Sequence, residues 1–74
     1  MDAISKTLMR QLQKGEARPG MDVFFKTMEG NMIPHKILDI QDRGTYDLLS
    51  VSKLTKSGKV LRGVSTSGND DFWF

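Results

Sequence analysis

Four cationic residues and no acidic residue lie within a stretch of ten residues in the second half of the chain: Lys53, Lys56, Lys59 and Arg62. Lysine and arginine side chains gathered in this way can pair with phosphates and release counterions. Arg62 could also stack on a base or hold it with two hydrogen bonds. Tyr46, the only tyrosine, could offer a base a stacking surface. The pattern predicts a nucleic-acid interface, and the alternative is a solvated hairpin whose lysines keep a sheet edge from aggregating.

A second set of candidate residues lies at the two ends of the chain. Lys6, Arg10 and Lys14 recur every four residues, so on a helix they would form one basic outer face. The last six residues, NDDFWF, weakly resemble the acidic and aromatic tails with which single-stranded DNA-binding proteins recruit partners. If the chain is an adaptor, we expect Trp73, Phe74 and the basic face to bind the partner. In the alternative interpretation, the two phenylalanines of the tail close the core and the tryptophan lies outside it.

Catalytic and metal-binding chemistry has few residues to use. There is no Cys and only one His, His35, which rules out a cysteine nucleophile and a thiolate zinc site. Asp39, Asp42 and Asp47 lack the spacing of a calcium loop or of a catalytic pair. No glycine-rich phosphate-binding motif occurs. We therefore expect a protein that is not an enzyme and holds no metal or cofactor, with His35 hydrogen-bonded in a strand at the edge of a barrel.

A chain of 74 residues is short enough to form one domain. Apolar residues recur at helical spacing near its start, and Gly15 suits the position after the end of a helix. Arg18 precedes Pro19, which forces extended geometry and prevents the helix from continuing. Within residues 1–74, the expected parts are a helix over 2–14, a linker over 15–21 and a β-barrel over 22–74.

Five strands are expected in the barrel, and the second is the longest. Ile33 and Ile37 fall on one face of this strand, whereas Ile40 would join that face only after a shift in register. A bulge or sharp bend produces such a shift and lets one strand serve both layers of a small barrel. The expected strands cover residues 22–28, 32–40, 45–51, 59–66 and 71–74. The predicted core residues are Phe25, Ile37, Leu49 and Val64.

The order of these elements resembles that of the Sm-like proteins, a family of small barrels of the SH3-like kind that includes the bacterial Sm-like RNA chaperone. Gly30, Asp42 and the run Tyr46-Asp47-Leu48-Leu49 follow the order of the family's first motif, and Leu61-Arg62-Gly63 is similar to its second. His35 stands where the first motif has a glycine, and Asp47 where it has an asparagine. The resemblance implies a mainly β fold, with an N-terminal helix packed on a bent five-stranded antiparallel barrel, and it implies RNA binding.

The sequence therefore predicts a non-catalytic binding module for RNA or single-stranded nucleic acid. The alternative is a protein-binding adaptor or inhibitor that docks on a larger nucleic-acid-handling machine such as an RNA polymerase. Either module could form an oligomer, because a core of this size gains from a partner. The absence of Cys, of a signal segment and of an apolar run of membrane-spanning length favours a cytoplasmic protein that binds no membrane.

Overall fold

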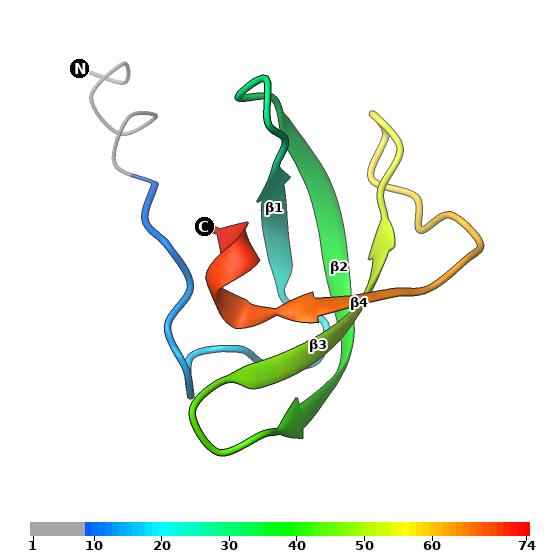
Figure 1. Ribbon diagram of the computed structural model, residues 1–74. Helices are drawn as coiled ribbons and strands as arrows, with labels where there is room; N and C mark the ends of the chain where they lie inside the picture. The colour runs from blue at the N-terminus through cyan, green and yellow to red at the C-terminus, as the bar shows by residue number, and fades with distance from the viewer. Residues whose placement is uncertain (1–8) are drawn as a thin grey trace.

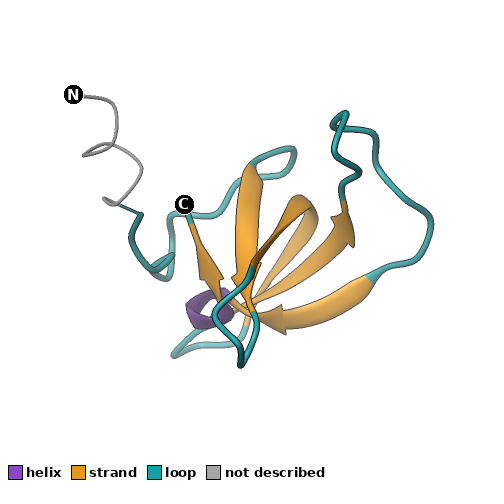
Figure 2. Cartoon of the chain, turned by 90° about the horizontal axis from the view of Figure 1, so that it is seen from above, coloured by secondary structure: helices purple, strands orange, loops and turns teal. Residues whose placement is uncertain are grey.

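Five antiparallel strands form one sheet that curls into a half-barrel in the computed structural model, which describes residues 9–74 (Figure 1). The order of the strands across the sheet is β4-β3-β2-β1-β5. Seen from above, the strands wrap around a common interior, and a single turn of 3₁₀ helix lies beside it (Figure 2). The elements are β1 (Asp22–Lys26), β2 (Met32–Asp42), β3 (Asp47–Lys53), β4 (Ser65–Gly68), η1 (Asn69–Asp71) and β5 (Phe72–Trp73).

The long strand β2 connects the two halves of the sheet, because it pairs with β1 over its first part and with β3 over most of its length. Its register against β3 shifts between Ile37 and Asp39, so Leu38 is an extra residue opposite no partner. Leu38 points outward and is 41% exposed, while Ile37 is buried and Ile40 packs against the core. The predicted change of phase in this strand is confirmed: one bulged residue lets isoleucines three positions apart face the same interior.

The core fills the inner face of the sheet and consists mainly of alternating residues on neighbouring strands. Ile37 and Leu49 are fully buried, as predicted, and Phe25 is half-buried against the core. Val64 is 63% exposed, so its assignment to the core is wrong. It lies just before β4, where the chain has not yet entered the sheet. The buried apolar residues are Leu12, Ala17, Val23, Ile37, Leu49, Val51 and Phe72.

The segment before β1 runs alongside the last strand, in place of the expected helix. Residues 9–14 contain no helix, and the earlier part of the predicted helix, residues 2–8, lies outside the described residues. Arg10 and Phe74 exchange two backbone hydrogen bonds of 2.9 Å, and the Leu12 amide donates to the Phe72 carbonyl at 2.9 Å. A short isolated helix is marginal in water. Pairing with the free edge of β5 and burying Leu12 are the stronger interactions here.

The fourth and fifth strands differ most from expectation. The fourth was expected over residues 59–66, but β4 begins only at Ser65. The residues before it form a projecting hairpin and loop, residues 53–64, which we call the basic arm. The fifth strand begins at Phe72 because η1 occupies the three residues before it. Among residues 9–74, no helix is long and apolar enough to cross a membrane.

Candidate nucleic-acid interface

The inner face of the half-barrel opens at one end into a pocket of about 350 Å³. This volume lies at the lower end of the range of roughly 300–1,000 Å³ found for ligand sites. One side of the pocket is apolar and aromatic, and the other carries an ammonium group and two hydroxyls. The lining residues are Phe25, Ile33, His35, Val51, Lys53, Ser65, Ser67 and Phe72.

Strand register explains why these residues meet. His35 is the cross-strand partner of Lys53, and Val51 is the partner of Ser65. Side chains two positions apart on a strand share a face, so all these residues point to the same side of the sheet as the core. On the opposite wall, Phe25 pairs with Phe72 on β5. The pocket is therefore an open continuation of the core, and its lining includes polar residues as well as apolar ones.

Three rings line the pocket. The centroids of Phe25, His35 and Phe72 lie 5.9–6.2 Å apart in pairs, and each pair meets edge to face. Such pairs hold aromatic side chains in fixed orientations. The Nδ1 atom of His35 lies 2.9 Å from the carbonyl oxygen of Ile33. The interpretation of His35 as a hydrogen-bonded strand residue is confirmed, although its strand is in the middle of the sheet and not at its edge.

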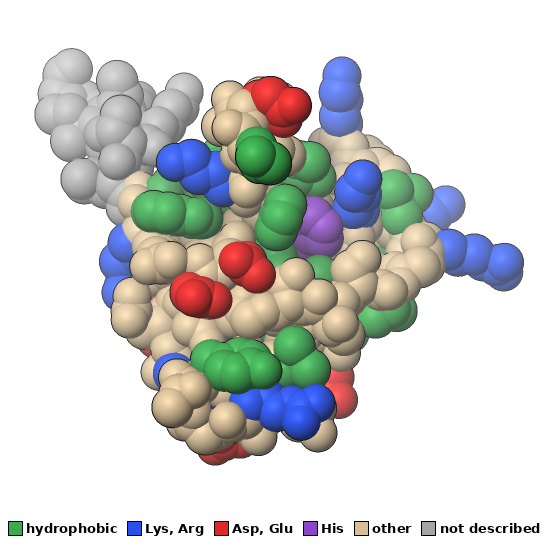
Figure 3. All heavy atoms as spheres, in the orientation of Figure 1, with side chains coloured by type: hydrophobic (Ala, Val, Ile, Leu, Met, Phe, Trp, Pro, Cys, Tyr) green, Lys and Arg blue, Asp and Glu red, His purple; other side chains and the backbone are tan. Residues whose placement is uncertain are grey.

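Hydrogen bonds give the basic arm a defined shape beside this pocket. Leu54 and Val60 form an isolated bridge, and the Leu61 amide donates to the Lys53 carbonyl at 2.9 Å. The Ser52 hydroxyl donates to the Gly63 carbonyl at 2.6 Å and ties the end of the arm to β3. Lys and Arg side chains project into solvent around this side of the molecule (Figure 3). The arm therefore presents its cations from a folded scaffold.

The predicted phosphate-binding residues Lys53, Lys56, Lys59 and Arg62 all lie on the basic arm and are exposed. Within residues 9–74, none of them forms an ion pair with a carboxylate. No acidic residue occurs between Asp47 and Asp70 in the sequence. Repulsion among the four cations is thus not relieved by neighbours along the chain. Lys53 belongs both to the arm and to the pocket lining, and it joins the two features into one candidate interface.

Tyr46 is not part of this arrangement. It is half exposed just before β3 begins, whereas Lys53 is the last residue of that strand. Lys53 follows Tyr46 by seven positions along this strand, a span of roughly 23 Å at about 3.3 Å per residue. The ring of Tyr46 lies instead beside Gly68 at the end of β4. The aromatic groups near the cations are the three rings of the pocket.

The residues expected to bind a protein partner are mostly engaged within the chain. Arg10 forms an ion pair with Glu16 at 2.8 Å, and its guanidinium lies over the ring of Phe74. Phe74 also packs against the core, and the ammonium of Lys26 lies 5.4 Å from the ring centroid of Trp73. Lys6 lies outside the described residues. Among the described residues, the predicted basic helix face therefore does not exist.

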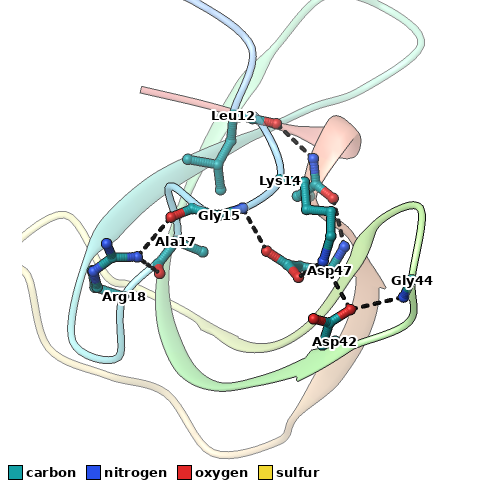
Figure 4. A network of polar contacts seen from close by, with 9 residues as sticks. Leu12, Lys14, Gly15, Ala17, Arg18, Asp42, Gly44 and Asp47 are labelled. Carbon is teal, nitrogen blue, oxygen red and sulfur yellow. Dashed lines mark hydrogen bonds and ion pairs between the residues drawn. The ribbon is translucent and has the colours of Figure 1, made fainter.

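Lys14 instead belongs to a network that holds the N-terminal segment against β3 (Figure 4). Its ammonium lies 2.8 Å from Asp42 Oδ1 and 3.0 Å from Asp47 Oδ1. The other oxygen of Asp47 accepts from the Gly15 amide at 2.8 Å. The hydrogen bonds that the Lys14 ammonium donates to both carboxylates raise the pKa of Lys14. The two carboxylates thus bind a side chain of this protein, and their role is structural.

Charge pairing and hydrogen bonds lower the pKa of three carboxyl groups in this region. For Asp42 the main cause is the hydrogen bond from Lys14, followed by the one from the Gly44 amide. For Asp47 it is the Gly15 amide, with Lys14 second. For Glu16, which lies in the N-terminal segment itself, it is the hydrogen bond from the Gln13 amide, with Arg10 adding to the effect. All three groups are held in their charged form when the N-terminal segment is in place.

Sequence reasoning missed the pocket residues Phe25, His35, Ser65, Ser67 and Phe72 as parts of a site. The sequence pattern places Phe25 and Phe72 in the core, and it indicates a strand residue without a ligand for His35. One signal was present: two polar residues, His35 and Lys53, occupy inward positions that are otherwise aliphatic along β2 and β3. Polar residues on the buried face of a sheet indicate that the core ends there and a polar environment begins.

Comparison with known proteins identified no relative. No family model matches the chain, and neither a curated protein nor a solved structure shows significant similarity to it. The function is therefore inferred from the residues and their geometry.

Proposed function

We propose that the protein is a non-catalytic binding module for RNA or another single-stranded nucleic acid. The observation that carries the proposal is the position of Lys53, which lines an aromatic pocket and begins an arm of four cations without acidic neighbours. Single strands are bound in general by a positive surface that follows the backbone and by aromatic side chains that contact unstacked bases. The arm would contact phosphates, and the pocket would take a base.

Within this proposal, the half-barrel is related in architecture to the SH3-like and Sm-like barrels. The five antiparallel strands and the bulged second strand support this relationship. Two features count against the Sm-like assignment in particular. Arg62 and Gly63 lie on the basic arm and not in a strand, and Asp47 is turned toward the N-terminal segment. Nucleic-acid binding is therefore argued from the arm and pocket of this chain, because a shared barrel fold does not define a function.

The salt dependence of binding tests the proposal directly. A fluorescently labelled octamer of uridine would be titrated with the protein at several salt concentrations. Four phosphate contacts on a single strand predict a slope of about −3 for the logarithm of affinity against the logarithm of salt concentration. Lys56→Ala should weaken binding of all sequences similarly and reduce the slope by about 0.7. An unaltered slope in this variant would remove Lys56 from the interface.

Arg43→Ala provides the matched control, since it also removes one exposed cation. Arg43 lies in the turn between β2 and β3, at the far end of β3 from the arm. We expect this variant to bind with the affinity and slope of the unaltered protein. Equal effects of the two substitutions would show that net charge, and not the arm, governs binding. No detectable binding of any oligonucleotide at about 50 mM salt would overturn the proposed function.

A protein-binding adaptor is the second candidate. The outer edge of β4 supports it, since within residues 9–74 this strand pairs with β3 alone and could accept an added strand from a partner. Val60, Leu61 and Val64 add apolar side chains that are 43–63% exposed nearby. In this case, a partner captured from extract would remain bound after nuclease treatment, and Ser67→Pro in β4 would release it. Arg62→Ala would then affect capture less than it affects oligonucleotide binding.

A further inference from the structure

The hydrogen bond of His35 determines which of its two ring nitrogens carries the proton. The other nitrogen keeps a free lone pair. A carbonyl oxygen can only accept, so Nδ1 must donate its proton to the Ile33 carbonyl, 2.9 Å away. In the neutral ring, Nε2 is then an acceptor. Nε2 has no hydrogen-bond partner within residues 9–74, and no buried side-chain nitrogen or oxygen in this part of the chain lacks one. Nε2 must therefore be reachable by solvent, although the residue as a whole is only 6% exposed.

The other polar groups of the pocket complement this acceptor. Lys53, the cross-strand partner of His35, has an ammonium that can only donate. The hydroxyls of Ser65 and Ser67 can turn to donate or to accept, so they do not discriminate. Phe25 and Ile33 form an apolar wall opposite. A flat ring between these walls would thus meet one fixed acceptor, with the ammonium of Lys53 as a donor within reach.

We propose that the pocket selects bases that carry an imino N–H next to a carbonyl, namely uracil, thymine, guanine and hypoxanthine. This inference rests on the proposed function. The N–H would donate to Nε2 of His35, and the adjacent carbonyl would accept from Lys53 or from a serine hydroxyl. Cytosine and adenine present a bare ring nitrogen at the same position. Two acceptors would then face each other, and the desolvated Nε2 would be left without a partner.

The test compares octamers of uridine, cytidine and N3-methyluridine in equilibrium binding to the unaltered protein at about pH 8. At this pH an imidazole is ordinarily neutral, with a proton on one ring nitrogen and a lone pair on the other. We expect the uridine octamer to bind roughly tenfold more tightly than the cytidine octamer. Uracil would form one buried hydrogen bond with Nε2 of His35, whereas cytosine would leave Nε2 without a partner. Methylation at N3 removes the donor and should lower the affinity to that of cytidine. All three measurements use the unaltered protein, so they do not depend on whether a variant folds.

His35→Asn provides the second arm of the test. Asparagine can retain a donor to the Ile33 carbonyl but has no atom at the position of Nε2. We expect this variant to bind uridine and cytidine octamers equally and to keep the salt slope of the unaltered protein. The ¹⁵N resonance of Nε2 should also shift when the unaltered protein binds the uridine octamer.

The outcomes separate this inference from the proposed function. Equal affinities for the three octamers, with a steep salt slope, would overturn the base preference and leave nucleic-acid binding intact. A uridine preference that survives His35→Asn would also overturn it, because another group would then read the base. Failure to bind any of the octamers would overturn both proposals.

Discussion

The side chain of Asn69 accepts a hydrogen bond of 2.8 Å from the backbone amide of Asp47, and it is buried. The same side chain donates to the Leu12 carbonyl at 2.8 Å. One amide group therefore connects the first residue of β3, the 3₁₀ turn and the N-terminal segment. These positions are 22 and 57 residues from Asn69 along the chain. Asp47 completes the connection by accepting from the Gly15 amide and from Lys14.

Replacing Asn69 by alanine should destabilise the fold strongly. The substitution leaves the Asp47 amide and the Leu12 carbonyl without partners in a buried site, and each such group costs about 1–3 kcal/mol. We expect a loss of roughly 2–4 kcal/mol in the free energy of unfolding, measured by urea denaturation. Asn31→Ala, at an exposed position in the turn after β1, is the control and should change stability by less than about 0.5 kcal/mol. Equal stabilities of the two variants would contradict the role of Asn69.

Stability should fall at acid pH because of the carboxylates around Lys14. Folding lowers the pKa of Asp47 and of Asp42 from the ordinary value of 3.8. Their contribution is therefore complete above about pH 4 and is lost as the pH falls from 3.8 through the lower folded-state values. In Asp47→Asn, the urea midpoint should depend less on pH in this range. Asp39→Asn, which replaces an exposed carboxylate, should retain the dependence of the unaltered protein.

The same network predicts a loss of stability at alkaline pH. Folding raises the pKa of Lys14 above 10.5, so its contribution is present below that value and is lost as the pH rises through the folded-state pKa. Lys14→Met keeps an unbranched side chain and removes the charge. We expect the thermal midpoint of this variant to change less between about pH 9 and pH 11 than that of the unaltered protein. An identical decline in both proteins would assign the alkaline loss to other groups.

The bulge in β2 can be tested with two neighbouring residues. Ile37→Ala removes a fully buried side chain and should cost about 2–4 kcal/mol in unfolding free energy. Leu38→Ala truncates the outward-facing bulged residue and should cost less than about 1 kcal/mol. Both values can be measured by urea denaturation followed by circular dichroism. Similar losses in the two variants would mean that the register of β2 is wrong.

The hydrogen bond from Ser52 to the basic arm should affect the affinity for nucleic acid more than the stability of the fold. Ser52→Ala removes the hydrogen bond to the Gly63 carbonyl and should cost about 1 kcal/mol. Amide hydrogens in the arm should then exchange faster, and the affinity for a uridine octamer should fall although every cation remains. Ser50→Ala, on the same strand, is the control and should leave both measurements unchanged. Unaltered exchange in Ser52→Ala would show that the arm is held by other contacts.

Several features of the fold were predictable because they depend on local sequence alone. The shifted phase of Ile37 and Ile40 predicted the bulge in β2, since side chains alternate between the faces of a strand. Gly30 falls between the first two expected strands, and its φ of 90° is a conformation that glycine adopts without steric cost. The absence of acids around the four cations was equally visible, and the structure keeps all four exposed on one arm.

Only the tertiary structure decided where the N-terminal segment and the pocket lie. Leu12 has the spacing of an amphipathic helix, but its backbone pairs with a strand about sixty residues later in the chain. Local periodicity reports which side chains share a face, and it does not report which distant edge offers free backbone groups. The same limit hid the pocket, whose residues come from five strands and meet only through their register. It also hid the role of Asp47, whose partners Gly15 and Asn69 reach it only when the half-barrel is formed.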